Sequence, residues 1–221
     1  MGPRLKETRA PHPAKTALPP YWSRAKRALR RADPVLGEVI DAFRGESLEP
    51  RGDPFVTLAR AIVGQQISVK AAAAVWGRLE ERVGPMSPET VAGSSVQKLR
   101  ACGLSRGKAG YCKGLAEGFL EGALDPAGWR AQDDEAVIAE LTKVKGVGRW
   151  TAEMFLIFHL LRPDVLPLGD IGLQRALARH YGDGEALEPA EMSALAEPWR
   201  PWRSVATWYL WRSLDPIPIA Y

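Results

Sequence analysis

The amino-acid sequence predicts an all-α protein, and two observations lead to this fold class. Apolar residues recur three or four positions apart through most of the chain after residue 20, and several of these segments follow a serine or aspartate that can cap a helix. No segment alternates apolar and polar residues between turn-forming residues, as a half-buried strand would. With 221 residues, of which 46% are hydrophobic, the chain can bury a substantial core.

Residues that commonly begin or end helices predict where each helix lies, in chain order. The first expected helix begins near Pro34 and stops at Gly45. Asp53 can cap the next helix, with Pro54 at its first position, and a turn at residues 64–66 separates it from a helix ending near residue 83. The later helices are expected to begin at residues 87 and 95 and to span residues 105–118, 133–144, 149–161, 170–181, 189–197 and 201–214.

Positive charge is concentrated at the N-terminal end of the sequence. The chain carries 30 basic and 26 acidic residues, for a net charge of +4. Residues 1–31 contain nine basic side chains and one acidic side chain, so the remainder is net acidic. Such an arm favours binding to a polyanion, although it is also typical of a solvated tail followed by one exposed helix face. Residues 1–21, basic and rich in proline, are expected to form a flexible tail.

Composition excludes several classes of protein. The longest apolar runs fall well short of the ~20 residues that cross a membrane, so no membrane association is expected. Cys102 and Cys112 are the only cysteines, too few for a disulfide framework, a zinc finger or a four-cysteine iron–sulfur cluster. These two cysteines and the lack of an apolar secretory signal predict a cytoplasmic protein, or a nuclear one if its source is eukaryotic.

A predicted helical hairpin at residues 141–152 is the first candidate binding site. Gly146 and Gly148 form a Gly-x-Gly turn between a helix end and a helix start. The first N–H groups of the second helix have no partner within it and can bind an anion, and Lys143, Lys145 and Arg149 surround them. The pattern fits phosphate binding, and it fits an ordinary helical hairpin with a glycine cap equally well.

Asp170 and two tryptophans form the second candidate site. Asp170 stands where a helix N-cap belongs, so it either caps that helix or supplies a carboxylate that stabilises a developing positive charge. Trp150 and Trp211 fall on predicted helices, where tryptophan usually packs in the core. Alternatively, their rings could wall a pocket for a flat or cationic base.

Five blocks of sequence, in order and at suitable spacing, resemble the helix-hairpin-helix DNA glycosylases. The nearest likeness is to their alkylation-repair branch, the DNA-3-methyladenine glycosylase II enzymes. The resemblance covers residues 35–214 and implies a two-lobed helical fold around a central cleft. The blocks are residues 55–69, 103–109, 141–152, 169–170 and 199–204.

The resemblance divides the chain into three parts. One helical lobe would comprise residues 55–162 and end with the hairpin. The other would combine residues 22–54 with residues 163–221 and carry the catalytic carboxylate. The tail of residues 1–21 would stand outside both lobes, and the cleft between the lobes would hold the active site.

The resemblance also assigns roles at this active site. Asp170 would be the catalytic carboxylate, and Trp150, Trp211 and Met154 would line the base pocket. Met154 stands where a relative has a pocket tyrosine, so this wall would be softer and would stack less well on a base.

The hairpin and the turn at residues 64–66 would contact DNA. The hairpin would hold a phosphate through backbone N–H groups, and carbonyls around Val144 and Gly146 would hold a structural K⁺ or Na⁺. Gln66 lies where a relative inserts an apolar wedge into the gap left by the flipped base, and glutamine departs from that pattern. The implied DNA-binding residues are Gln66, Lys143, Lys145, Gly146, Val147, Gly148, Arg149 and Thr151.

The activity that the resemblance implies is excision of alkylated purines, of the 3-methyladenine and 7-methylguanine type, from double-stranded DNA in base excision repair. The base would be flipped out and its N-glycosidic bond hydrolysed, by a monomer that requires no cofactor. Bifunctional members carry a lysine nucleophile just after the hairpin, where this chain has Trp150, so no lyase step is expected. Two alternatives stay open: the same fold acting on deaminated or etheno purines, and a non-catalytic DNA-binding module.

Overall fold

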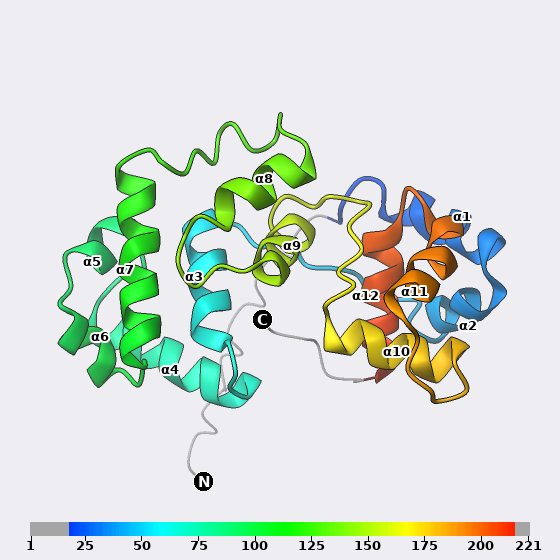
Figure 1. Ribbon diagram of the computed structural model, residues 1–221, viewed down its shortest axis with the longest axis horizontal. Helices are drawn as coiled ribbons and strands as arrows, with labels where there is room; N and C mark the ends of the chain where they lie inside the picture. Colours follow the sequence, from blue (N-terminus) through cyan, green and yellow to red (C-terminus); the bar gives the residue numbers. More distant parts are fainter. Residues whose placement is uncertain (1–17, 215–221) are drawn as a thin grey trace, which may run out of the picture.

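The computed structural model describes residues 18–214, which form α-helices joined by loops, with no β-strand among them (Figure 1). The all-α prediction is confirmed, whereas most of the expected tail lies outside the described residues. No helix within residues 18–214 has the length and apolarity needed to span a membrane. In chain order the elements are α1 (Trp22–Ala32), α2 (Pro34–Ala42), α3 (Pro54–Gly64), α4 (Val69–Arg82), α5 (Pro88–Ala92), α6 (Val96–Ala101), α7 (Arg106–Leu120), α8 (Asp134–Leu141), α9 (Arg149–Phe158), α10 (Ile171–Tyr181), α11 (Pro189–Leu195), a 3-10 turn η1 (Glu197–Trp199) and α12 (Arg203–Leu214).

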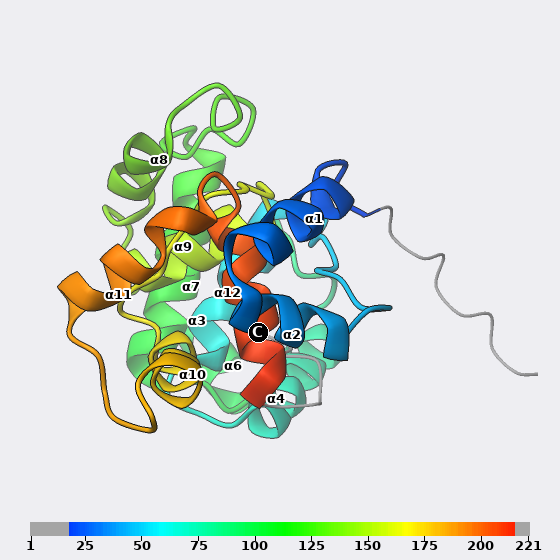
Figure 2. The same cartoon turned by 90° about the vertical axis from the view of Figure 1, so that its right-hand side faces the viewer.

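The helices pack in two groups. In the first group α3 contacts α4, α7 and α9, while α7 also contacts α5 and α6, and α8 contacts α9. In the second group α12 contacts α1, α2 and α10. Figure 1 shows these groups side by side, and Figure 2, turned by 90°, shows α12 behind α1 and α2. Whether the groups act as two lobes around a DNA-binding cleft stays a prediction.

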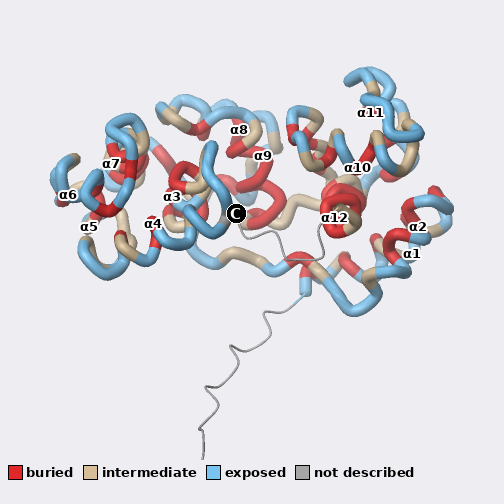
Figure 3. Tube along the Cα trace, turned by 90° about the horizontal axis from the view of Figure 1, so that it is seen from below, coloured by how far each residue is buried: buried red, intermediate tan, exposed pale blue. Residues whose placement is uncertain are grey.

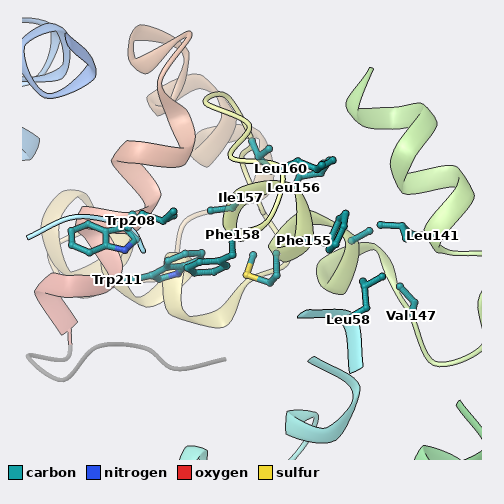
Figure 4. Packing of buried hydrophobic residues seen from close by; sticks show 14 of the residues in the cluster. Leu58, Leu141, Val147, Phe155, Leu156, Ile157, Phe158, Leu160, Trp208 and Trp211 are labelled. Atoms are coloured by element: carbon teal, nitrogen blue, oxygen red, sulfur yellow. The ribbon is translucent and has the colours of Figure 1, made fainter. Parts of the chain in front are cut away.

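Helices α9 and α12 lie where the two groups meet and are the most deeply buried parts of the chain (Figure 3). All residues from Thr151 to Phe158 are buried, and so are all residues from Ser204 to Arg212. The rings of Phe158 and Trp211 stack across this boundary with centroids 5.9 Å apart (Figure 4). The buried hydrophobic side chains form one continuous cluster that includes both groups. The boundary is therefore packed like the rest of the core.

Capping residues begin most of the helices, as the sequence predicts. Each predicted cap accepts a hydrogen bond from the backbone N–H three residues later, which satisfies a donor that the helix itself leaves without a partner. The confirmed caps are Asp53, Ser68, Ser87, Ser95, Ser105, Asp133 and Asp170.

Helices α8 and α9 end earlier than predicted. After Leu141 the backbone tightens, because Val144 N–H bonds the carbonyl of Leu141 at 3.1 Å, three residues back instead of four. Beyond Phe158 the chain leaves the helix through Leu161, whose φ is 57°. There Arg162 N–H bonds the carbonyl of Leu156, six residues back, at 2.9 Å, so the chain turns away from the helix axis at this point.

The N-terminal part of the described chain contains a helix that is not among the expected ones, and it includes one packed residue of the expected tail. Helix α1, which the sequence analysis does not identify, turns its apolar residues inward and leaves basic residues at its surface. Tyr21, inside the expected tail, stacks on Trp202 with ring centroids 5.7 Å apart. Its hydroxyl donates to the carbonyl of Leu161 at 2.8 Å. The packed fold therefore begins at or before this tyrosine.

A buried aspartate ties α2 to the C-terminal helices. Asp33 caps α2 by accepting a hydrogen bond from Leu36 N–H at 3.0 Å. Its other carboxylate oxygen accepts from the Tyr181 hydroxyl and from the Trp199 indole, both at 2.8 Å. The tyrosine is the last residue of α10 and the tryptophan is the last residue of η1, so one carboxylate joins segments that are far apart in the sequence.

We predict that Asp33→Asn lowers the free energy of unfolding by about 1–3 kcal/mol, because an amide NH₂ would then face a donor that the carboxylate now satisfies. Asp53→Asn is the matched control, since Asp53 is exposed and accepts one backbone bond that asparagine accepts equally well. Urea unfolding of the two variants measures the difference. Equal stability of the two variants would contradict the prediction.

Candidate active site

The geometry of the second candidate site centres on Asp170. Its side chain is 3% exposed and caps α10 by accepting the Leu173 N–H through Oδ1 at 2.6 Å. The same oxygen accepts the indole N–H of Trp211 at 2.7 Å, and Oδ2 accepts the indole N–H of Trp150 at 2.8 Å. Three donors and a helix N-terminus therefore stabilise negative charge on a buried carboxylate.

The two tryptophans thus have a role that sequence reasoning missed. Their rings were expected to wall a pocket, and their N–H groups also orient the carboxylate. Trp211 is 1% exposed and stacks on Phe158, so in this structure it belongs to the core (Figure 4). Gly172 permits this approach, because a Cβ there would lie 3.0 Å from Asp170 Oδ1 and 3.1 Å from Trp211 Cδ1.

A cavity of about 410 Å³ lies between α3, the turn at residues 64–68 and α9. This volume falls within the usual range for a small-molecule site. Trp150, Met154, Thr151 and Gln66 line the cavity, whereas Asp170 and Trp211 do not. Arg51 and Arg60 also line it, and the sequence analysis identified neither of them.

Trp150 connects the cavity with the carboxylate, because it lines the one and donates a hydrogen bond to the other. The structure therefore brings together the catalytic aspartate and the three pocket residues expected at the active site, in two adjoining parts. Met154 and one side of Trp150 face the cavity, while Asp170 and Trp211 lie in the packed junction behind it. A base entering the cavity would approach the carboxylate along Trp150.

The hairpin has the geometry expected of an anion site. Gly146 has a φ of 89°, and the following residues turn directly into α9. Gly148 is the N-cap of α9 and supplies no side-chain cap, so the first N–H groups of that helix have no capping side chain. Lys143 and Lys145 are exposed on the turn, while Val147 is buried beneath it.

Arg149, predicted to contact DNA, is held by two acidic residues. Its guanidinium donates to Glu135 through both terminal nitrogens and to Glu153 through Nε at 3.0 Å. These partners raise the pKa of Arg149 and balance its positive charge. They also clamp the first turn of α8 to the first turn of α9, across the hairpin.

Glu153 is a buried carboxylate that sequence reasoning missed. Its side chain is 7% exposed, and burial raises its pKa, as does the like charge of Asp170 nearby. The guanidinium of Arg149 acts in the opposite direction. No local signal identifies this residue, because a glutamate in the first turns of a helix is usually exposed.

The comparisons with known proteins agree with this geometry. Residues 59–201 match the family described as HhH-GPD superfamily base excision DNA repair protein. DNA-3-methyladenine glycosylase 1 of Schizosaccharomyces pombe is 33% identical over 185 residues, which cover 80% of each chain.

Two solved structures are similar in fold as well as in sequence. A DNA-3-methyladenine glycosidase from Bacillus halodurans has a TM-score of 0.76 and 36% identity, covering 86% of this chain and 89% of that one. The 3-methyladenine DNA glycosylase Mag1 of S. pombe, in complex with abasic DNA, has a TM-score of 0.76 and 29% identity, covering 86% and 96%.

Gly146 and Gly148 are predicted to differ in how well they tolerate replacement by alanine. A Cβ on Gly146 would lie 2.3 Å from Cδ2 of Tyr111, and its positive φ disfavours other residues. We expect Gly146→Ala to lower the free energy of unfolding by about 2–4 kcal/mol. Gly148→Ala is the control, because nothing lies within 4 Å of a Cβ there and its φ is −91°. Equal losses in chemical denaturation would be the contrary result.

Glu153 is predicted to make stability fall as the pH rises. Because its pKa is raised on folding, its contribution is fully present below the unfolded-state value and is lost as the pH rises through the folded-state value. Glu153→Gln should therefore flatten the decline of unfolding free energy from about pH 4.5 upward. Glu135→Gln is the control, and its effect on the pH dependence of stability should have the opposite sign, because the hydrogen bond from Arg149 lowers the pKa of Glu135. Urea unfolding across pH 4–8 compares the two variants, and identical effects would refute the assignment.

Proposed function

Because the chain belongs to the HhH-GPD superfamily of base excision DNA repair proteins, we propose that it is a DNA glycosylase that releases alkylated purines from double-stranded DNA. One observation carries the proposal. A buried carboxylate, Asp170, is oriented by two indole N–H groups beside a cavity of suitable size for a base. The names of the S. pombe and B. halodurans relatives support 3-methyladenine as a substrate.

The protein would first bind DNA through contacts that do not depend on the base sequence. The N–H groups at the start of α9 would bind a phosphate, with Lys143 and Lys145 adding positive charge. A base inside the duplex is out of reach, so the nucleotide must rotate into the cavity at a cost of a few kcal/mol. The two helical groups would form the two sides of the cleft that receives it.

The departing base needs little help from an acid. Alkylation at N3 or N7 makes the purine cationic, so when the C1′–N bond breaks the electron pair neutralises the base as it leaves. Positive charge then develops on the sugar, where the ionised carboxylate of Asp170 would stabilise it. Water adds to C1′ and releases a proton, which leaves an abasic sugar.

Asp170 retains one position for a reacting group. A carboxylate offers about four lone-pair sites, and the three hydrogen bonds described above occupy three of them. The fourth would accept a hydrogen bond from the attacking water. The fixed indole donors keep the carboxylate from rotating away, so its charge is already in place when the transition state forms.

The reaction would stop at the abasic site. Strand cleavage by bifunctional relatives requires a lysine amine just after the hairpin, and Trp150 stands there. Its indole N–H is a hydrogen-bond donor to Asp170 and cannot form a Schiff base. We therefore propose that the enzyme hydrolyses the N-glycosidic bond without lyase activity. From the family resemblance we also propose that it acts as a monomer.

The hairpin carbonyls also fit a monovalent cation. The carbonyl of Val144 accepts Val147 N–H at 3.0 Å, and that of Gly146 accepts the side-chain amide of Gln65 at 2.8 Å. Each carbonyl oxygen has a second lone pair, and neutral carbonyl oxygens can replace the hydration shell of a monovalent cation such as K⁺. When bound, the ion would add positive charge at the phosphate site.

We predict that Asp170→Asn lowers release of 3-methyladenine from methylated duplex DNA at least about 100-fold. Asp33→Asn is a matched control, because Asp33 is also a buried cap that accepts an indole N–H. Released base is measured by chromatography, and strand breaks are scored with and without alkali. The wild type should give breaks only after alkali.

Three results would contradict the proposal. Unchanged release by Asp170→Asn would remove the carboxylate from the mechanism, and strand breaks without alkali would reveal a lyase. Tight duplex binding with no release of any alkylated, deaminated or etheno purine by the wild type would leave a DNA-binding module.

A further inference from the structure

One block of the sequence that carries the resemblance, residues 103–109, has no part in the site described so far. Lys108, in the first turn of α7, donates hydrogen bonds from Nζ to the carbonyl oxygens of Val63, at 2.8 Å, and of Gln65. Both carbonyls belong to the C-terminal end of α3, where a helix leaves its last carbonyls without partners. The lysine is half-buried, and burial lowers its pKa.

The segment that Lys108 holds is a strained turn, residues 64–68. Gln66 has a φ of 58°, a left-handed conformation that is unfavourable for a residue such as glutamine. Ile67, next to it, is a large apolar side chain that is 41% exposed. Both residues line the cavity that Trp150 also lines. These two residues, Gln66 and Ile67, form the tip of the turn. The tip therefore lies beside the proposed site and has a backbone conformation that its own sequence does not favour.

A second link joins this turn to the hairpin. The side-chain amide of Gln65 donates to the carbonyl of Gly146 at 2.8 Å. Gly146 itself packs against the ring of Tyr111, on α7. Tyr111 and Lys108 are three residues apart and so share one face of α7. Helix α7 lies beside α3 (Figure 1). Through these two side chains one face of α7 contacts both the turn and the hairpin.

We propose that Lys108 and Gln65 form a brace that positions the tip of the turn relative to the phosphate-binding hairpin. Lys108 fixes the carbonyl immediately before the strained residue Gln66, and Gln65 fixes the turn to Gly146. DNA held at the hairpin then meets the tip in a preset position, without further ordering of the loop. Lys108 is a positioning residue in this role, and the inference rests on the proposed binding of DNA.

A comparison within α7 separates this role from ordinary helix capping. Lys113, five residues later, donates through Nζ to the carbonyls of Ala92 and Ser94, at the end of α5. The two lysines therefore make the same kind of contact from the same helix. The end of α5 borders neither the hairpin nor the cavity, so Lys113 offers a matched control for the loss of a half-buried ammonium.

The experiment measures the distortion of DNA separately from catalysis. The duplex carries a tetrahydrofuran abasic analogue beside 2-aminopurine, whose fluorescence rises when its stacking is lost. We expect Lys108→Met and Gln65→Ala to weaken this signal at saturating protein, and Lys113→Met to leave it unchanged. Lys108→Arg, which keeps the charge and the donors, should restore part of it.

Base release provides the second readout. Lys108→Met should slow release of 3-methyladenine from duplex DNA about 10-fold, because a misplaced loop must be ordered again at each encounter. Release from single-stranded methylated DNA, which needs no distortion of a duplex, should change less than about twofold. Thermal unfolding of both methionine variants shows whether their stability losses are equal.

The outcomes separate the brace from the proposed function. Equal fluorescence signals for the two methionine variants, or equal slowing of release on duplex and single strand, would overturn the brace. A wild type that distorts the duplex but releases no base would refute the proposed activity alone, because the fluorescence comparison still tests the brace. A wild type that gives no fluorescence change at all would overturn the brace.

Discussion

The hydrogen bonds from Trp150 and Trp211 to Asp170 are the interaction on which the rest of the structure depends. Each tryptophan comes from a different helical group, one on α9 and the other on α12, and the carboxylate begins α10. An ionised carboxylate at 3% exposure would be strongly unfavourable without such donors. The same bonds therefore make burial of the charge possible and fix how the two groups meet.

This junction places the proposed catalytic carboxylate near the loops that would hold DNA. Trp150 follows Gly148 of the hairpin turn by two residues, so any shift of this turn moves an indole that orients Asp170. The hairpin rests in turn on α7 through Tyr111, and on the first turn of α8 through Glu135 and Arg149. Helices α7 and α8 thus support the hairpin, and the proposed phosphate site shares one short stretch of α9 with an indole that orients Asp170.

The sequence predicts what short-range interactions decide and misses what distant partners decide. The caps at Asp53 and Asp170 and most helix starts are confirmed, because each depends on a few neighbouring residues. The indole bonds to Asp170 come from residues 20 and 41 positions away, and Lys108 reaches carbonyls more than 40 residues earlier. No periodicity shows such contacts. Glu153 was missed for the same reason, since only the packed fold buries it.

Asp33 shows why the chemistry of Asp170 alone does not define the site. Both aspartates are buried, both cap a helix and both accept an indole N–H. The partners of Asp33 lie within the core of the second helical group, and none of them lines the cavity. Asp170 shares Trp150 with that cavity and with the hairpin. The position of the carboxylate between a packed junction and an open space, more than its burial or its donors, is therefore what supports a catalytic role for Asp170 and a structural role for Asp33.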